Sequence, residues 1–208
     1  MPNKTLPIII TNDYILIKDK ESETFKSFSM PGIEPKPNIP FFHEFAKKIS
    51  ECQYYFKQAI RAVYGKKTSK YILAIITPDD TSPLESIFIN EFFVNSGACK
   101  AVAQTTISQV LSKEHKKYIS ISKTCRNVVL QYINNNEIEA TMSYDCTNYD
   151  VNQIAEDAKR LHIDVEYADM PVFINNLNLN MSDFGDVGIM LSPRQILDKI
   201  AGIDVEKI

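Results

Sequence analysis

Two groups of basic side chains are the first candidates for chemistry in this sequence, because both could bind an anion. Lys123 and Arg126 lie in the segment ISISKTCRNVV, between two apolar runs. Lys66, Lys67 and Lys70 follow a glycine that is expected to end a helix, and cations suit the dipole at that end of a helix. Solvated ends of a hairpin and of a helix therefore explain these groups better than a phosphate-binding patch.

No nucleophile, base or metal site stands out among the remaining reactive residues. The four cysteines are spread widely and form no CxxC pair, and no histidine lies at ligand spacing beside them, which favours free thiols over a metal site. Ser82 with His43 or His115 lacks the glycine pattern of a nucleophile elbow. His162 closes a predicted helix, so contact with backbone carbonyls explains it better than contact with a substrate. We predict no catalytic and no metal-binding residues.

The composition excludes several classes of protein. The chain has 208 residues, enough for one large domain or two small ones, and its apolar fraction of 44% is too high for a disordered protein. A formal net charge of -3 gives no large field to attract nucleic acid. No signal-peptide pattern is found, and no run reaches the roughly 18 apolar residues that cross a bilayer. We expect a cytoplasmic protein with no transmembrane segment and no nucleic-acid partner.

The elements that must position these residues alternate between strands and helices. In the first half the hydrophobic pattern predicts three strands, a helix, a strand, a helix, a strand and a helix. Residues 71–76 are nearly all apolar, which predicts a central strand that is covered on both faces. The eight predicted elements are residues 6–10, 14–18, 23–30, 41–64, 71–76, 82–95, 101–104 and 106–112.

The second half repeats this order weakly. Three strands are followed by a helix, two strand candidates, a further strand and a last helix. Because strands alternate with helices, we expect parallel pairing with helices on both faces of each sheet, which is an α/β fold. The predicted elements are residues 118–122, 128–133, 138–143, 151–161, 163–167, 170–177, 187–191 and 195–200.

This order of elements resembles the bacterial actin family, MreB in particular. The segment ITPDDTSPLESIFINEFFVNSGACKAV is similar to that family's strand, valine-proline turn, Glu-bearing helix and Ala-Gly-Ala helix end. The resemblance covers most of residues 1–145, and it is one of pattern only beyond them. It implies two ribonuclease-H-like lobes with the order βββαβαβ(α), residues 1–113 and 114–208, as in the actin, Hsp70 and sugar kinase superfamily. The chain is much shorter than MreB, which implies a core without the outer subdomains at full size.

The two loops that hold nucleotide phosphates in that family are altered here. Neither carries a glycine, which the family needs there so that backbone N–H groups can approach a phosphate closely. Both loops are therefore interpreted as degenerate. Their positions in this sequence are Thr11, Asn12, Asp13, Ser122, Lys123 and Thr124.

The carboxylates of the family are missing as well. The acidic pair that positions the attacking water falls near Thr105 and Thr106, and the metal-coordinating carboxylates have no counterpart. Because phosphoryl transfer depends on positioning and charge neutralisation, most catalysis should be lost, and no cofactor is expected. Gly185 and Gly188, in the segment DFGDVG, match the family's adenosine loop as a possible relic. A tight turn before a strand explains them better.

These observations favour a degenerate, MreB-like protein that acts without catalysis. We expect a structural or regulatory role, linked to cell shape or filament assembly, through association with itself or with an actin-like filament. Two alternatives stay open. One is an active ATPase that binds ATP and Mg²⁺ with atypical phosphate loops, and the other is a small-molecule sensor that uses the cleft between the lobes. An intact Asp-Gly loop would favour the ATPase, so its absence favours association.

The helix predicted over residues 41–64 carries more aromatic side chains than one buried stripe needs. Rings that remain exposed would mark a contact surface, which predicts a homodimer or a longer assembly. In the competing interpretation the proline-rich loop 31–40 covers these rings. The rings concerned are Phe41, Phe42, Phe45, Tyr54, Tyr55 and Phe56.

Overall fold

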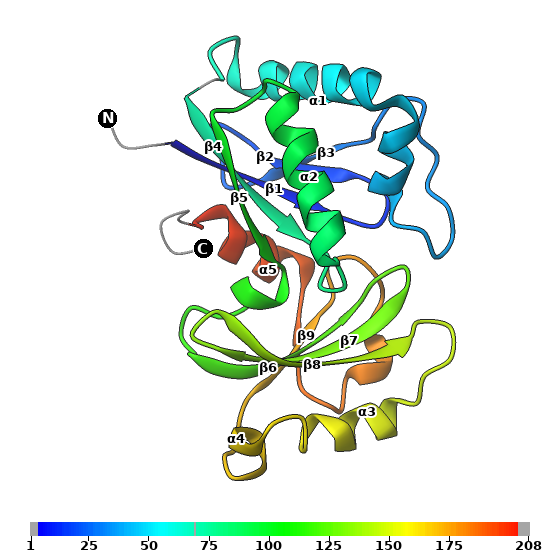
Figure 1. Ribbon diagram of the computed structural model, residues 1–208. Coiled ribbons are helices and arrows are strands. Elements are labelled where there is room, and N and C mark those ends of the chain that lie inside the picture. Colours follow the sequence, from blue (N-terminus) through cyan, green and yellow to red (C-terminus); the bar gives the residue numbers. More distant parts are fainter. Residues whose placement is uncertain (1–3, 69, 204–208) are drawn as a thin grey trace. The chain divides into compact units, whose positions relative to one another are not determined.

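A computed structural model describes residues 4–68 and 70–203, which form two compact α/β units (Figure 1). Residues 4–105 with 200–203 make the first unit, and residues 106–199 make the second. Each unit contains one mixed five-stranded sheet, which confirms the predicted α/β class with two copies of one plan. The boundary predicted between residues 113 and 114 stays a prediction about independently folding domains.

The first sheet has the strand order β3-β2-β1-β4-β5. The first three strands form an antiparallel meander, and β4 pairs with β1 in parallel. β4 lies between β1 and β5 and is almost entirely buried, as predicted for residues 71–76. The strands are Lys4–Ile10 (β1), Ile15–Lys18 (β2), Phe25–Phe28 (β3), Tyr71–Thr77 (β4) and Ala101–Thr106 (β5).

The long helix predicted for the first unit is two helices of different type. A 3-10 helix, η1 (Phe41–Lys48), leads into the α-helix α1 (Ile49–Tyr64). Three phenylalanines of η1 are at most 2% exposed. Their packing into the core accounts for the tighter winding, which is common where an α-helix begins.

The second helix of the first unit, α2 (Pro83–Asn95), begins with a capping box, which the spacing of Ser82 and Glu85 in the sequence predicts. Ser82 Oγ accepts the N–H of Glu85 at 3.3 Å, and Glu85 Oε2 accepts the N–H of Ser82 at 2.7 Å. The other carboxylate oxygen of Glu85 lies 2.5 Å from His43 Nε2. One side chain therefore caps α2 and ties it to η1.

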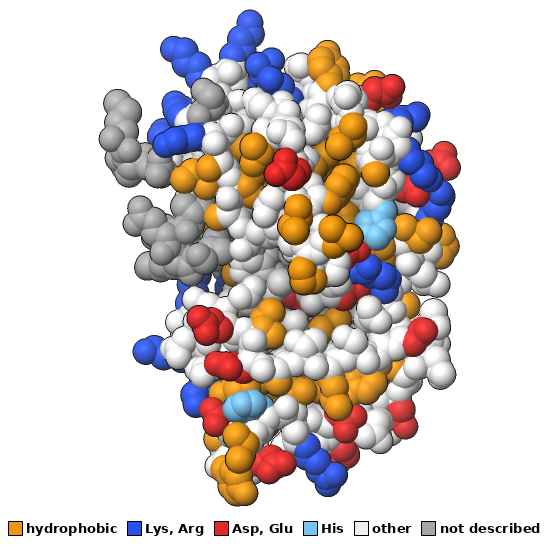
Figure 2. Space-filling model, viewed as in Figure 1, with side chains coloured by type: hydrophobic (Ala, Val, Ile, Leu, Met, Phe, Trp, Pro, Cys, Tyr) orange, Lys and Arg blue, Asp and Glu red, His pale blue; other side chains and the backbone are white. Residues whose placement is uncertain are grey.

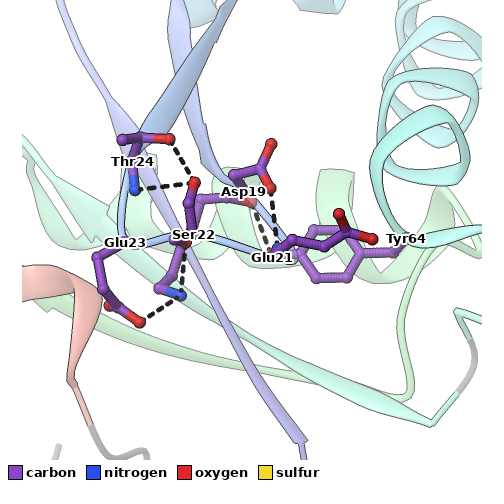
Figure 3. Close-up of polar contacts among 7 residues, drawn as sticks. Asp19, Glu21, Ser22, Glu23, Thr24 and Tyr64 are labelled. Carbon is purple, nitrogen blue, oxygen red and sulfur yellow. Dashed lines mark hydrogen bonds and ion pairs between the residues drawn. The ribbon is translucent and has the colours of Figure 1, made fainter.

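Hydrogen bonds hold the turn between β2 and β3, and one further bond joins this hairpin to the end of α1 (Figure 3). Lys18 Nζ donates to the carbonyl of Ser22 at 3.2 Å and contacts Glu23 Oε1 at 3.3 Å. Tyr64 Oη donates to the carbonyl of Lys18 at 2.6 Å. Burial raises the pKa of Tyr64, so its hydroxyl stays a donor. The last turn of α1 thus fixes the hairpin of β2 and β3.

The second sheet repeats the plan of the first, with the order β10-β9-β6-β7-β8. β6, β7 and β8 form an antiparallel meander, β9 pairs with β6 in parallel, and β10 pairs with β9 in parallel. The strands are Lys117–Lys123 (β6), Asn127–Asn134 (β7), Glu137–Asp145 (β8), Val172–Asn175 (β9) and Ile189–Leu191 (β10).

Two predicted elements that lie in the second unit have a different structure. The helix predicted over residues 106–112 is only a 3-10 turn, η2 (Ser108–Val110), and the strand predicted over 163–167 is a short helix, α4 (Ile163–Glu166). His162 does not close the preceding helix. Its Nδ1 accepts the N–H of Asp164 at 3.2 Å, so it caps the start of α4. A local side-chain bond thus overrides a weak strand pattern.

The remaining helices follow the prediction more closely. α3 ends three residues earlier than expected, and α5 begins at Pro193, two residues before the predicted start. No helix among the described residues is long and apolar enough to cross a membrane. These elements are α3 (Val151–Ala158), η3 (Ser182–Phe184) and α5 (Pro193–Ala201).

The aromatic rings expected to remain exposed are mostly inside the first unit. Phe41, Phe42, Phe45 and Phe56 are at most 2% exposed, so four of the six rings belong to the core and the predicted aromatic surface is smaller than expected. Only the two neighbouring tyrosines, at positions 54 and 55, are exposed, by 59% and 36%. The 3-10 segment turns its phenylalanines into the core, which a single α-helical stripe could not do.

Candidate functional site

The first candidate phosphate loop is the turn between β1 and β2, and its own threonine closes it. Thr11 is buried, and its backbone N–H and its Oγ1 donate to the carbonyl of Tyr14 at 3.0 and 2.8 Å. Thr11 Oγ1 also accepts the N–H of Tyr14 at 3.1 Å and that of Asp13 at 3.4 Å. The backbone N–H groups of Thr11, Asp13 and Tyr14 are therefore used inside the turn and are not offered to an anion.

The second candidate loop, between β6 and β7, has the same construction. Thr124 donates from its backbone N–H and its Oγ1 to the carbonyl of Asn127, at 2.8 and 3.3 Å. Its Oγ1 accepts the N–H of Arg126 at 3.1 Å and that of Asn127 at 3.0 Å. The sequences of the two turns, TNDY and TCRN, share only the threonine. We call this pair of structures the threonine turns.

The other residues of the second loop also have structural surroundings. Lys123 Nζ lies 4.8 Å from the centroid of the Tyr149 ring and 3.2 Å from its hydroxyl oxygen. The Tyr149 ring in turn stacks on Phe184, with centroids 5.9 Å apart. An aromatic face attracts a cation, so Lys123 is held against its own unit. Ser122 is 2% exposed, and its Oγ has no hydrogen-bond partner within the described residues.

The glycines of the possible adenosine loop lie between η3 and β10. Gly185 donates its N–H to the carbonyl of Ser182 at 3.1 Å. A Cβ atom at Gly188 would lie 2.5 Å from the carbonyl oxygen of Val172 in β9. Close packing of two strands therefore requires Gly188, without any ligand. Binding of an adenosine group at these glycines stays a prediction.

Hydroxyl groups occupy the region where the family has its catalytic acids. Thr77 Oγ1 donates to the carbonyl of Thr105 at 3.3 Å. Thr106 donates from its N–H and its Oγ1 to Gln109 Oε1, at 3.0 and 3.2 Å. No three His, Cys, Asp or Glu side chains are grouped to hold a metal ion in the part of the chain that the structure describes. These threonines serve local structure.

Sequence reasoning missed an apolar surface on α2. Leu84, Ile87 and Val94 are 76%, 60% and 45% exposed, and we call them the α2 outer face. Figure 2 shows hydrophobic side chains gathered along this helix. The opposite side of α2 is also apolar, because Phe92 and Phe93 are each 1% exposed. A surface helix normally has a polar outer side, so α2 presents an unusual outer side.

Comparisons with known proteins identify the fold. No protein-family model matches the sequence, and a search of curated proteins finds no significant match. The ethanolamine utilization protein EutJ from Carboxydothermus hydrogenoformans has 11% identity and a TM-score of 0.57, over 98% of this chain and 89% of that one. A putative N-acetylglucosamine kinase from Porphyromonas gingivalis has 10% identity and a TM-score of 0.58, over 94% and 98%.

A third similar structure is a filament. AlfA from a Bacillus subtilis plasmid has 11% identity and a TM-score of 0.52, over 95% of this chain and 97% of that one. At such low identity, these likenesses show the fold alone. They confirm, at the level of the fold, the actin-like architecture that the sequence resemblance implied.

Proposed function

Since this chain has the actin-like fold, we propose that it is a non-catalytic structural or regulatory protein that acts through association with other protein chains. The threonine turns carry this proposal. In both phosphate-loop positions a buried hydroxyl occupies backbone N–H groups, and neither turn contains a glycine. Without these N–H donors neither loop can bind the nucleotide phosphates, and the phosphates are not positioned for phosphoryl transfer.

The α2 outer face supports association, and the partner we propose is a second copy of this chain. Three large aliphatic side chains lie in contact with water along one helix, and burying apolar surface releases about 25 cal/mol per Å². Exposed groups of large apolar side chains mark contact sites on soluble proteins. The similar structure of AlfA is a filament, so a protein with this fold can build an assembly of copies.

In this proposal the association is MreB-like and takes place in the cytoplasm, where an assembly of copies would contribute to cell shape or to filament formation. The α2 outer face replaces the aromatic residues of η1 and α1 as the surface concerned. Four of those six rings are buried. The two exposed tyrosines, Tyr54 and Tyr55, lie on α1 and have an edge-to-face ring contact with each other.

Sedimentation equilibrium at tens of micromolar protein tests this role. We expect the wild type to exceed its monomer mass of 23.7 kDa. The double variant Leu84→Glu with Ile87→Glu should be monomeric, because burying two carboxylates in an apolar contact is costly. The matched control is Ser50→Glu with Gln58→Glu, which adds the same charges at exposed polar positions of α1.

The control variant should associate as the wild type does. A wild-type protein that is a clean monomer at every concentration would refute self-association. An assembly that survives in the Leu84→Glu, Ile87→Glu variant would instead show that the contact surface lies elsewhere on the chain.

A further inference from the structure

The outer edge of β8 is an open strand that the proposed function does not use. β8 has 9 residues, more than any other described strand, and no residue in it is buried. It pairs with β7 on one side and has no neighbouring strand on the other among the described residues. Proteins usually keep such edges short or covered, since an open edge is a template for another strand.

The hydrogen-bond pattern shows which backbone groups of β8 point away from the sheet. Residues of an antiparallel pair exchange backbone hydrogen bonds only at every second position. Cys146 donates its N–H to the carbonyl of Arg126, directly beyond the pair of Asn127 with Asp145. The even-numbered residues 140, 142 and 144 therefore bond to β7. The N–H and C=O groups of Thr141 and Ser143 point outward, where they can pair with an added strand.

The negative charge along this edge favours a basic partner strand. β8 carries Glu137, Glu139 and Asp145 and no basic residue, and the facing strand β7 is uncharged. Hydrogen bonds from Thr147 hold the pKa of Asp145 below its usual value, which keeps this carboxylate ionised. A further carboxylate, that of Asp157 in α3, accepts a hydrogen bond from Tyr144 at 2.8 Å.

A second copy of this chain fits the edge poorly. β8 carries three carboxylates and no basic residue, so edge-to-edge pairing of two β8 strands would bring six carboxylates together. Like charges that face each other across a strand pair are destabilising. The register of β8 also shifts at Glu139, and such bulges hinder edge-to-edge pairing. Self-pairing of this edge is therefore disfavoured, while its outward backbone groups stay available to a strand of opposite charge.

We propose that the outer edge of β8 binds an extended segment of a partner protein in which every second residue is lysine or arginine. The segment would join the sheet as an added strand, with main-chain hydrogen bonds to Thr141 and Ser143. Its basic side chains would lie near the carboxylates of this edge, those of Glu137, Glu139 and Asp145. Its other side chains would lie beside Met142, which is 43% exposed on the opposite face of the strand. Main-chain bonds give affinity in this mode of recognition, and the alternate side chains give selectivity.

Fluorescence anisotropy with a labelled peptide of alternating lysine and valine tests this site. We expect saturable binding that weakens as salt rises, and no binding of the same peptide with glutamate in place of lysine. The variant Glu137→Lys with Glu139→Lys should weaken binding by about tenfold, because attraction becomes repulsion at two positions. The matched control, Glu166→Lys with Asp169→Lys, makes the same charge change at exposed positions outside β8.

A backbone test separates strand pairing from charge attraction alone. Ser143→Pro removes an outward N–H and no bond to β7, so it should abolish binding while circular dichroism shows an unchanged fold. If this variant does not fold, hydrogen exchange of the wild type replaces it. The amides of Thr141 and Ser143 should then become protected when the lysine-valine peptide is added. Equal binding by the β8 variant and its control would overturn the proposal. Binding without protection of these amides, or binding that survives Ser143→Pro, would also overturn it.

Discussion

Replacing Phe93 by alanine is expected to lower the free energy of unfolding by about 3–5 kcal/mol. The ring is 1% exposed and forms edge-to-face contacts with Phe56 and Phe92, at centroid separations of 4.6 and 5.1 Å. The smaller side chain would leave a cavity at the centre of the aromatic core that joins α1 to α2. Urea denaturation followed by circular dichroism measures the change.

Two control variants show whether the two sides of α2 differ in their contribution to stability. Phe93→Leu keeps most of the apolar volume and should cost clearly less than Phe93→Ala. Leu84→Ala, on the outer side of the same helix, should change the stability by less than about 1 kcal/mol, because Leu84 is 76% exposed. If Leu84→Ala cost as much as Phe93→Ala, the outer face would be packed within the monomer and would not be free for a partner.

Replacing Thr124 by valine is expected to lower the free energy of unfolding by about 1–3 kcal/mol. Valine has nearly the same shape but lacks the hydroxyl, so the N–H groups of Arg126 and Asn127 lose the acceptor that they contact at 3.1 and 3.0 Å. Thr124 is 2% exposed, and water replaces such a bond poorly. Urea denaturation again gives the difference.

The variant Thr124→Ser is the matched control for this turn. Serine keeps the hydroxyl and should retain most of the stability of the wild type. The substitution Thr11→Val should act in the same direction, since Thr11 closes the β1–β2 turn through the same contacts. Equal stability of the valine and serine variants at position 124 would show that the hydroxyl does not hold the turn. The structural interpretation of the loop would then lose its basis.

The strands and their order were predictable from the sequence because their apolar runs are short and separated by strong turns. β4 is the clearest case, since six of its seven residues are buried. The start of α2 was equally readable, because the spacing of Ser82 and Glu85 describes a capping box. In these elements the local preference and the tertiary packing agree.

Other features depend on contacts that a linear pattern does not contain. The winding of η1 follows from three phenylalanines that pack into one core, and the helix α4 depends on one bond from Asp164 to His162. The α2 outer face could not be predicted from the sequence. This helix is apolar on both sides, so its hydrophobic pattern does not show which side is buried. The threonine turns left one signal, a threonine at the start of each hairpin turn.

Isothermal titration of the protein with Mg-ATP tests a non-catalytic role most directly. With both phosphate-loop positions closed by Thr11 and Thr124, we expect no binding, or a dissociation constant of about 1 mM or weaker. Phosphate release from ATP should stay at the rate of the buffer. A micromolar dissociation constant together with magnesium-dependent hydrolysis would contradict the proposed function and would make this chain an active ATPase with atypical loops.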